Sequence, residues 1–516
     1  MKTPAALSAA LAVAIIGIFL AVSDPPLDPE PWTEMPPLRA LDGPYEPNTL
    51  LEGATRLQEG EVLAPESFAV SPDGTLYGGL ADGRVVAMDA LGQNARPVFF
   101  SGGYAIAAAV AAAAATAAGT ATGGKSSGSS SDGDGLTAAP RLMAECHKLA
   151  QQGVLHHDVV MERSCGRPLG LRWSGKNLYI LDAYHGLFAL DPATHSAVRL
   201  FDPNATVVTV PHASAADAAA EIYPDVLKRP RFLNDLAIAS NGIIYMTDSS
   251  WKNFRAQNRR EILDAGGRGR LLRLDPRTGK ATTLLCGLHF PNGLEIEPSG
   301  ERLLFVESMR LRILSVRLAD LERPHPSLLV ALATCGRESV SGAGGDIPTA
   351  ETAGVVKEAG AGTTKGAAAV GTTTTKGVGT AGVPRAVLGL PVAVSIFTDR
   401  IPGFADNIRW DAKTGAYLVG IGTKISQPFS ALHLLLRAPL AVRRAVGRLL
   451  PMSLIEKLVP RYGMVVAFGP DGGVRRSYHA PSGSVPFVSE VVRHPKSGFL
   501  FLGSHSNKFL ARVRLP

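Results

Sequence analysis

A strand–turn–strand unit recurs six times along this chain and restricts the folds open to it. Each copy has an alternating apolar run, a turn that contains Gly and a second apolar run, and the copies begin at Glu66, Arg167, Phe232, Phe290, Phe404 and Phe487. Short strands joined by such turns are typical of antiparallel sheets. One unit cannot bury both faces of its sheet, so the copies must pack against one another. We predict an all-β, six-bladed β-propeller over residues 42–516; a β-sandwich is the alternative, which the long repeat and the copy number disfavour.

Three segments depart from the repeat. Residues 105–136 are polyalanine followed by Gly, Ser and Asp, and residues 337–383 are rich in Ala, Gly and Thr, so both are expected to be low-complexity surface loops. Residues 426–463 have apolar residues at helical spacing, several arginines and three prolines, which predicts a short helical insertion. Two interpretations of this insertion remain open: a lid packed on its own blade, or a basic amphipathic surface that touches a membrane.

The N-terminus carries an uncharged apolar run from Ala5 to Val22, preceded by Lys2. Its 18 residues just reach the length that spans a bilayer, and the small residues around Ser23 also fit a cleavage site. Residues 1–23 are therefore predicted to be an N-terminal membrane anchor helix or a cleaved signal peptide, and the length favours the anchor. The body would be lumenal or extracellular, in a single-pass membrane protein or, alternatively, a secreted or vacuolar one.

Four cysteines suit such a compartment. Cys146 and Cys165 are close in sequence, lie among polar residues and could form a disulfide. Cys286 lies in an apolar run and is expected to be a buried thiol, whereas Cys335 adjoins the second low-complexity segment. No pair has the CxxC spacing of zinc or redox sites. Asn204 begins an Asn-Ala-Thr sequon and is a predicted glycosylation site in a lumenal body.

Charge and motifs exclude several classes of function. The formal net charge of +7 is a mild excess for 516 residues and no Lys/Arg block stands out, so no nucleic-acid partner is expected. The sequence contains no HExxH motif, and its one GxSxG string and its one GxxxxGKS string both lie in the low-complexity segment 105–136, without the strand–turn–helix context that a nucleophile elbow or a P-loop needs. Serine-hydrolase, nucleotide-binding and zinc-protease interpretations therefore lose their usual support.

Polar residues stand at the start of the inner strand in most copies. Inner strands of a propeller line a central channel, so their first residues gather at one end. The residues in question are Glu66, Asn234, Asp235, Asn292, Asp406 and Asn407, with Glu490 similarly placed in the last copy. Any one alone is more often a turn residue, but together their oxygens suit a hard cation such as Ca2+. His185, at the end of a second strand, could face the same channel as a catalytic group, although an ordinary surface or core histidine is commoner.

Several motifs together resemble one family. The stretches CGRPLGLRW, RFLNDLAIASNGIIYMTDSS, HFPNGLEIEPSGERLLFVES and IPGFADNIRWD are similar to those of the strictosidine synthase-like family. The resemblance covers most of the chain from about Asp42 onward, apart from the two low-complexity segments. It implies a six-bladed propeller, often with an N-terminal membrane anchor, and it favours a Cys146–Cys165 disulfide.

The resemblance also suggests an activity. The broader superfamily includes paraoxonase-type arylesterases and lactonases, whose channel-calcium ligands match Glu66, Asn234, Asn292, Asp406 and Asn407. This implies a calcium-dependent hydrolase acting on a small-molecule ester or lactone.

The general base remains open. A histidine of paraoxonases is replaced here by Leu169, which leaves Glu490, Asp235 and His185 as candidates. Strictosidine synthases instead condense an amine with an aldehyde through a glutamate that matches Glu490. Such a lyase, or a non-catalytic binding propeller, is the alternative.

Overall fold

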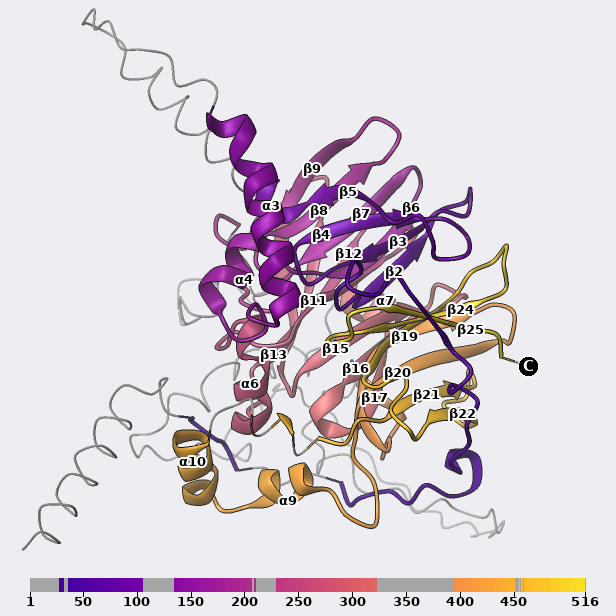
Figure 1. Cartoon of the computed structure of the whole chain (residues 1–516). Helices are drawn as coiled ribbons and strands as arrows, with labels where there is room; N and C mark the ends of the chain where they lie inside the picture. The colour runs from indigo at the N-terminus through magenta and orange to yellow at the C-terminus, as the bar shows by residue number, and fades with distance from the viewer. Residues whose placement is uncertain are drawn as a thin grey trace, which may run out of the picture.

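The protein is described by a computed structural model, which covers residues 27–31, 36–104, 134–206, 208–209, 229–322, 394–450, 454, 456–457 and 459–515. Within these residues the chain forms six sheets, each built mainly of consecutive antiparallel strands (Figure 1). The predicted anchor at 1–23 and the predicted loop at 337–383 lie outside the described residues, as does most of the loop at 105–136. No helix in the described part of the chain is long and apolar enough to cross a bilayer.

The sheets follow the predicted repeat. The first contains β2 (Ser67–Val70), β3 (Leu76–Gly79), β4 (Arg84–Met88) and β5 (Arg96–Phe100). The second contains β6 (Pro168–Ser174), β7 (Asn177–Asp182), β8 (Gly186–Asp191) and β9 (Ser196–Phe201). The third contains β11 (Leu233–Ile238), β12 (Ile244–Asp248), β13 (Gly269–Asp275) and β14 (Lys280–Leu288), with the short β10 (Val208–Thr209) parallel to β14.

The remaining sheets have the same order. The fourth contains β15 (Pro291–Ile296), β16 (Arg302–Glu307), β17 (Arg312–Arg317) and β18 (Val394–Thr398). The fifth contains β19 (Gly403–Asp411), β20 (Ala416–Lys424), β21 (Gly463–Phe468) and β22 (Val474–Ala480). The sixth contains β23 (Val488–Arg493), β24 (Leu500–Ser504), β25 (Leu510–Val513) and β1 (Thr55–Leu57).

The two ends of the described chain close the ring. Strand β1 pairs with β25 in antiparallel register, Thr55 opposite Arg512, so the N-terminal strand completes the last blade. Apolar clusters fill the space between neighbouring sheets, and one of them joins Phe68 of the first blade to Phe501 of the last. A sheet that packs on both neighbours leaves no bare apolar face. The predicted six-bladed propeller is confirmed, whereas the pairing of β1 with β25 was not foreseen.

Two disulfides bear on the cysteine predictions. Helices α3 (Asp134–Gln152) and α4 (Val159–Cys165) are joined by the Cys146–Cys165 bond, with a Cα–Cα distance of 5.7 Å, which confirms that pairing. Cys286 is also disulfide-bonded, so the expectation of a buried free thiol is wrong. The apolar sequence around this residue reflects the strand β14, in which it pairs with Arg270 of β13, and says nothing about its oxidation state.

The insertion at 426–463 contains α9 (Ala431–Arg437) and α10 (Leu440–Leu449). Its inner side packs on the propeller beside α6 (Asn258–Asp264), where Leu432 and Leu436 join Leu263 in one apolar cluster. The remaining helical elements are α7 (Leu318–Glu322) and the 3-10 turns η1 (Gly43–Tyr45), η3 (Arg255–Gln257) and η4 (Ser308–Arg310).

Candidate functional site

Three inner strands carry the same irregularity at the predicted polar residues. In β11, β15 and β19 the antiparallel register slips by one residue between Leu233 and Leu236, between Pro291 and Leu294, and between Ala405 and Ile408. Such a β-bulge sets two residues against one on the partner strand and re-aims their side chains. The residues inside the three bulges are Asn234 with Asp235, Asn292 with Gly293, and Asp406 with Asn407.

Glycine lets these bulges meet. A Cβ on Gly293 would lie 2.6 Å from the Cα of Asn407, closer than real Cβ contacts. Only the absence of a side chain allows β15 to approach β19 at this point. Gly293, which lies inside strand β15, therefore serves close packing between the inner strands.

The amide groups of the three bulge asparagines are held by their nitrogens. Asn234 Nδ2 donates to Ser249 Oγ at 2.9 Å, Asn292 Nδ2 to Ser308 Oγ at 3.4 Å, and Asn407 Nδ2 to the Glu66 carbonyl at 3.2 Å. With its nitrogen bound, each amide presents its oxygen in another direction. The oxygens Oδ1 of Asn292 and Asn407 are buried and have no hydrogen-bond partner.

Asp406 shares this condition. Its Oδ1 is also buried without a partner, and its side chain is only 8% exposed. Burial, together with the charges of Glu66 and Glu490, raises the pKa of Asp406 well above its ordinary value. Unpaired buried oxygens are costly, because they lose their water without gaining a donor.

Glu66 differs from Asp406 because it has cationic neighbours. Its Oε2 lies 2.5 Å from Arg167 Nη2 and 3.6 Å from Arg255 Nη2. Although burial opposes ionisation, these two arginines lower the pKa of Glu66. Glu66 is therefore held as a carboxylate whose charge is already largely balanced.

The donor set fits a hard cation better than a soft one. It contains carboxylate and amide oxygens, three of which are unpartnered, and such oxygens are what Ca2+ takes as ligands. Among the described residues, no three His, Cys, Asp or Glu side chains gather as a metal site. The predicted set has only two carboxylates, Glu66 and Asp406, and its other members are the amides Asn234, Asn292 and Asn407. A cation at this position would therefore need amide oxygens among its ligands, because two carboxylates alone do not form such a cluster.

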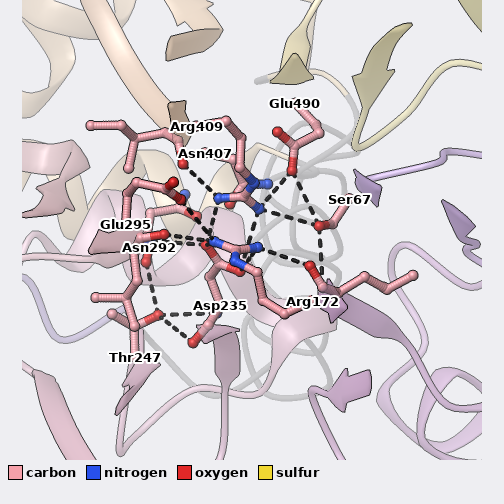
Figure 2. Close-up of polar contacts among 12 residues, drawn as sticks. Ser67, Arg172, Asp235, Thr247, Asn292, Glu295, Asn407, Arg409 and Glu490 are labelled. Atoms are coloured by element: carbon pink, nitrogen blue, oxygen red, sulfur yellow. Dashed lines mark hydrogen bonds and ion pairs between the residues drawn. The ribbon is translucent and has the colours of Figure 1, made fainter. Parts of the chain in front are cut away.

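Next to these residues lies a second group of charges, in which each carboxylate is within 4 Å of an arginine. Asp235 bonds Arg172 through both carboxylate oxygens at 3.1 and 3.2 Å, and Arg409 Nη1 at 2.9 Å. The other guanidinium nitrogen of Arg409 lies 2.6 Å from Glu490 Oε2 (Figure 2). Arg172 also approaches Glu295 at 3.7 Å. We call Arg172, Asp235, Glu295, Arg409 and Glu490 the ion-pair layer.

Pairing with arginine and burial have opposite effects on the carboxylate pKa values of the ion-pair layer. Burial opposes the charge of Asp235, but Arg172 and Arg409 lower its pKa below the ordinary value. Burial dominates at Glu490 and raises its pKa to about 7, despite the attraction of Arg409.

We call Glu66, Asn234, Asn292, Asp406 and Asn407 the cation set. A cavity of about 700 Å³ lies beside it. Glu66, Asn234, Asn292 and Asp406 line it, whereas Asn407 does not. Its other walls combine apolar side chains with arginines and lysine from η3, α6 and the insertion: Phe232, Phe290, Phe404, Leu432, Val459, Phe487, Arg255, Arg259, Lys457 and Arg461. An apolar cavity with a few converging polar groups is the usual form of a small-molecule site.

None of the three predicted catalytic residues lines this cavity. Asp235 and Glu490 are completely buried in the ion-pair layer. His185 lies in the turn between β7 and β8, where its backbone N–H donates to Asp182 Oδ1 and its Nε2 is buried without a partner. Their catalytic roles remain predictions that the geometry does not favour.

The cavity does contain a histidine that the sequence reasoning passed over. His505 lies between β24 and β25 and lines the cavity. Its Cε1 and Asp406 Oδ2 would lie 3.8 and 3.0 Å from the same point, a Cβ on Gly422. Burial lowers the pKa of His505 to about 4, against the opposing charge of Glu66. His505 follows the second strand of its blade, as His185 does, so the argument that singled out His185 also applied to it.

The protein is therefore a six-bladed propeller with a partly apolar cavity, and the polar side chains of the cation set form the floor of this cavity. The family description "Strictosidine synthase" matches residues 234–318, and "Strictosidine synthase-like, N-terminal" matches residues 43–88. These matches cover the strands that supply Glu66, Asn234 and Asn292.

Comparisons with individual proteins agree with this result. Adipocyte plasma membrane-associated protein of Gallus gallus is 27% identical over 99% of this chain and 89% of its own length. Protein strictosidine synthase-like 13 of Arabidopsis thaliana is 39% identical over 30% of this chain and 33% of its own. The predicted resemblance to the strictosidine synthase-like family is confirmed.

One solved structure also overlaps the chain. A gluconolactonase of Xanthomonas campestris covers 96% of this chain and 98% of its own, at 12% identity and a TM-score of 0.42. So low a TM-score and identity support no inference about activity.

Proposed function

We propose that the protein is a calcium-dependent hydrolase of small-molecule esters or lactones. The observation that carries the proposal is the group of three buried, unpartnered oxygens, from Asn292, Asp406 and Asn407. Asn292 and Asp406 themselves line the cavity, so a cation held there would be next to a bound substrate. The alternative, a permanently unsatisfied cluster of oxygens at the axis, would only destabilise the fold.

Glu66, Asn234, Asn292, Asp406 and Asn407 would hold the ion. When bound, Ca2+ supplies polarisation of a substrate carbonyl and stabilisation of the negative charge that develops on its oxygen. The chain's own apolar residues, among them Phe232, Phe290 and Phe404, would hold the acyl or aryl part and exclude water.

His505 is the group best placed to move a proton. It lines the same cavity as Asp406, and an uncharged imidazole can accept a proton from an attacking water. Glu490 and Asp235 have their oxygens committed to Arg409 and other partners, so we assign them to holding the axis together. A lyase that uses Glu490 as base would need Arg409 to move away first.

The proposed location is a lumenal or extracellular body held at a membrane. The Cys146–Cys165 disulfide suits an oxidising compartment. The relatives bear the name of a plasma membrane-associated protein, and the apolar run at 5–22 has the length of an anchor. Asn204 is exposed, as a glycosylation acceptor must be.

Chelation tests the proposal directly. The purified protein should hydrolyse phenyl acetate or a small lactone, lose this activity in a calcium chelator and regain it when Ca2+ is restored. Hydrolysis that persists in chelator would contradict the calcium site. Turnover of an amine–aldehyde pair that survives Asn292→Ala but not Glu490→Ala would favour the lyase. No turnover of any of these substrates would favour a binding propeller.

A further inference from the structure

The outer side of the helical insertion is apolar and exposed. Phe429 is 65% exposed, Leu434 57% and Leu449 53%, and Val442, Leu450 and Leu454 are exposed as well. The other exposed large apolar side chains among the described residues are scattered singly elsewhere. Single exposed apolar residues are ordinary, but a group of six on one short segment marks a surface that meets something else. We call these six residues, together with Arg437, Arg444 and Arg448, the insertion face.

The charge of this segment has one sign. Residues 426–463 contain six basic residues and a single acid, Glu456. Glu456 forms an ion pair with Arg259 of α6, and the buried Arg443 donates to the Glu30 carbonyl at 2.7 Å, so both are already engaged. The exposed arginines of the insertion face thus have no acid of their own segment beside them. In α10, Val442, Ala445 and Leu449 share one stripe, and Arg444 and Arg448 follow the neighbouring stripe.

The N-terminal segment reaches the propeller at the same place. Leu27 is buried and packs against Gly447 of α10. The two are so close that a Cβ added to Gly447 would lie 2.0 Å from Leu27 Cδ1. The backbone N–H of Asp28 donates to Asp264 Oδ1 of α6, and the backbone N–H of Glu30 donates to the Asp264 carbonyl, each at 2.8 Å. In Figure 1 this short indigo segment lies beside α10. The apolar run of the sequence ends five residues earlier, at Val22, and five residues span at most about 17 Å.

We propose that the insertion face docks on the surface of an anionic lipid bilayer. An apolar stripe flanked by arginines is the pattern of a helix that lies in the interface between water and lipid. Anionic headgroups complement the arginines, whereas a second copy of this chain would bring like charges together. The nearby apolar run places a bilayer, rather than a protein partner, within reach. Because the same insertion supplies Leu432 and Val459 to the cavity wall, docking brings the cavity next to the lipid.

A site-specific label tests this docking on the full chain. No free cysteine occurs among the described residues, so an environment-sensitive fluorophore can be attached to Leu449→Cys. The matched control is Val198→Cys in β9, which is 57% exposed and lies far from α10 (Figure 1). Both proteins are reconstituted into phosphatidylcholine vesicles with or without phosphatidylserine.

The expected result is specific to one label and one lipid. With phosphatidylserine, the label at 449 shifts its emission to shorter wavelength and is quenched by brominated lipid, whereas the label at 198 does neither. High salt and the Arg444→Glu/Arg448→Glu variant remove the effect, because screening and charge reversal abolish attraction to the headgroups.

Three outcomes would overturn the proposal. A label at 449 that stays aqueous on anionic vesicles means that the face does not dock. A shift that depends on protein density and not on phosphatidylserine points to a second copy of the chain. A shift that the double charge reversal leaves unchanged shows that the arginines do not select the surface. None of these readouts depends on hydrolysis, so the proposal stands or falls apart from the calcium site.

Discussion

Two adjacent groups of polar residues, the cation set and the ion-pair layer, share the strands β11, β15 and β19 but have different partners. The bulge of β11 contributes Asn234 to the cation set and Asp235 to the ion-pair layer. In the ion-pair layer, arginines from neighbouring inner strands neutralise the carboxylates. In the cation set, Asp406 Oδ1 and two amide oxygens have no donor. The difference is that arginines balance every carboxylate of the ion-pair layer and also Glu66, whereas no ion pair balances Asp406 among the described residues.

The largest expected effect is on kcat, and it distinguishes whether the catalytic base lies beside the cation set or in the ion-pair layer. We expect His505→Gln, at the cation set, to lower kcat by about a thousandfold, the usual scale for the loss of a positioned general base. His195→Gln, at an exposed turn, is the matched control and should leave kcat unchanged. Steady-state hydrolysis of phenyl acetate measures both. Normal hydrolysis by His505→Gln, with loss in Glu490→Gln, would move the catalytic base into the ion-pair layer.

The ion-pair layer should respond mainly in stability. Arg409→Met leaves Glu490 without its ion-pair partner and Asp235 with only Arg172, and we expect the free energy of unfolding to fall by about 3 kcal/mol. The exposed pair of Arg475 and Asp471 is the control, because Arg475→Met should cost less than about 0.5 kcal/mol. Urea unfolding in the presence of chelator measures both. Equal stability of the two variants would show that the ion-pair layer does not hold the axis together.

Without calcium, the cation set should make the stability of the protein depend on pH. The folded state raises the pKa of Asp406, so once the pH passes the ordinary value of 3.8 the unfolded chain releases this proton more readily than the folded one. Without calcium, stability is therefore lost as the pH rises from this value towards the raised pKa. Asp406→Asn removes the loss, so the variant should gain in melting temperature relative to the parent between pH 4 and neutral.

Calcium should remove the advantage in melting temperature that Asp406→Asn has over the parent protein. It should raise the melting temperature of the parent, because a ligand that binds only the folded state stabilises it. The same addition should leave Asp406→Asn nearly unchanged. A parallel pH dependence of parent and variant in chelator would contradict the assignment of an unpaired, buried Asp406.

The sequence repeat was enough to predict the fold and most residues of the cation set. Turn glycines and alternating apolar runs mark six units, and Asn234, Asn292 and Asp406 recur at one phase of that repeat, so their convergence followed from the ring itself. The split between Asn234 and Asp235 did not follow, because it depends on a β-bulge and a bulge leaves the apolar pattern intact. Arg409 was missed as a partner of Glu490 because the two lie on different blades, about 80 residues apart in sequence, and meet only where the inner strands β19 and β23 pack together.

Other misses have equally local causes. Strand β1 has only three residues and no repeat of its own, and it becomes a strand by pairing with β25. The disulfide bond of Cys286 could not be inferred from the apolar residues around it in the sequence. His505 lies in a turn after a second strand, and only the shape of the cavity distinguishes it from His185.

The central claim is that oxygens from four blades share one axial ion. Metal analysis of the purified protein, after equilibration with Ca2+ and removal of excess, tests it most directly. We expect a stoichiometric amount of calcium in the parent, none in Asp406→Asn, and the parental amount in Asp399→Asn, whose carboxylate is exposed. A parent that retains no calcium, or a variant at Asp406 that retains as much as the parent, would contradict the account.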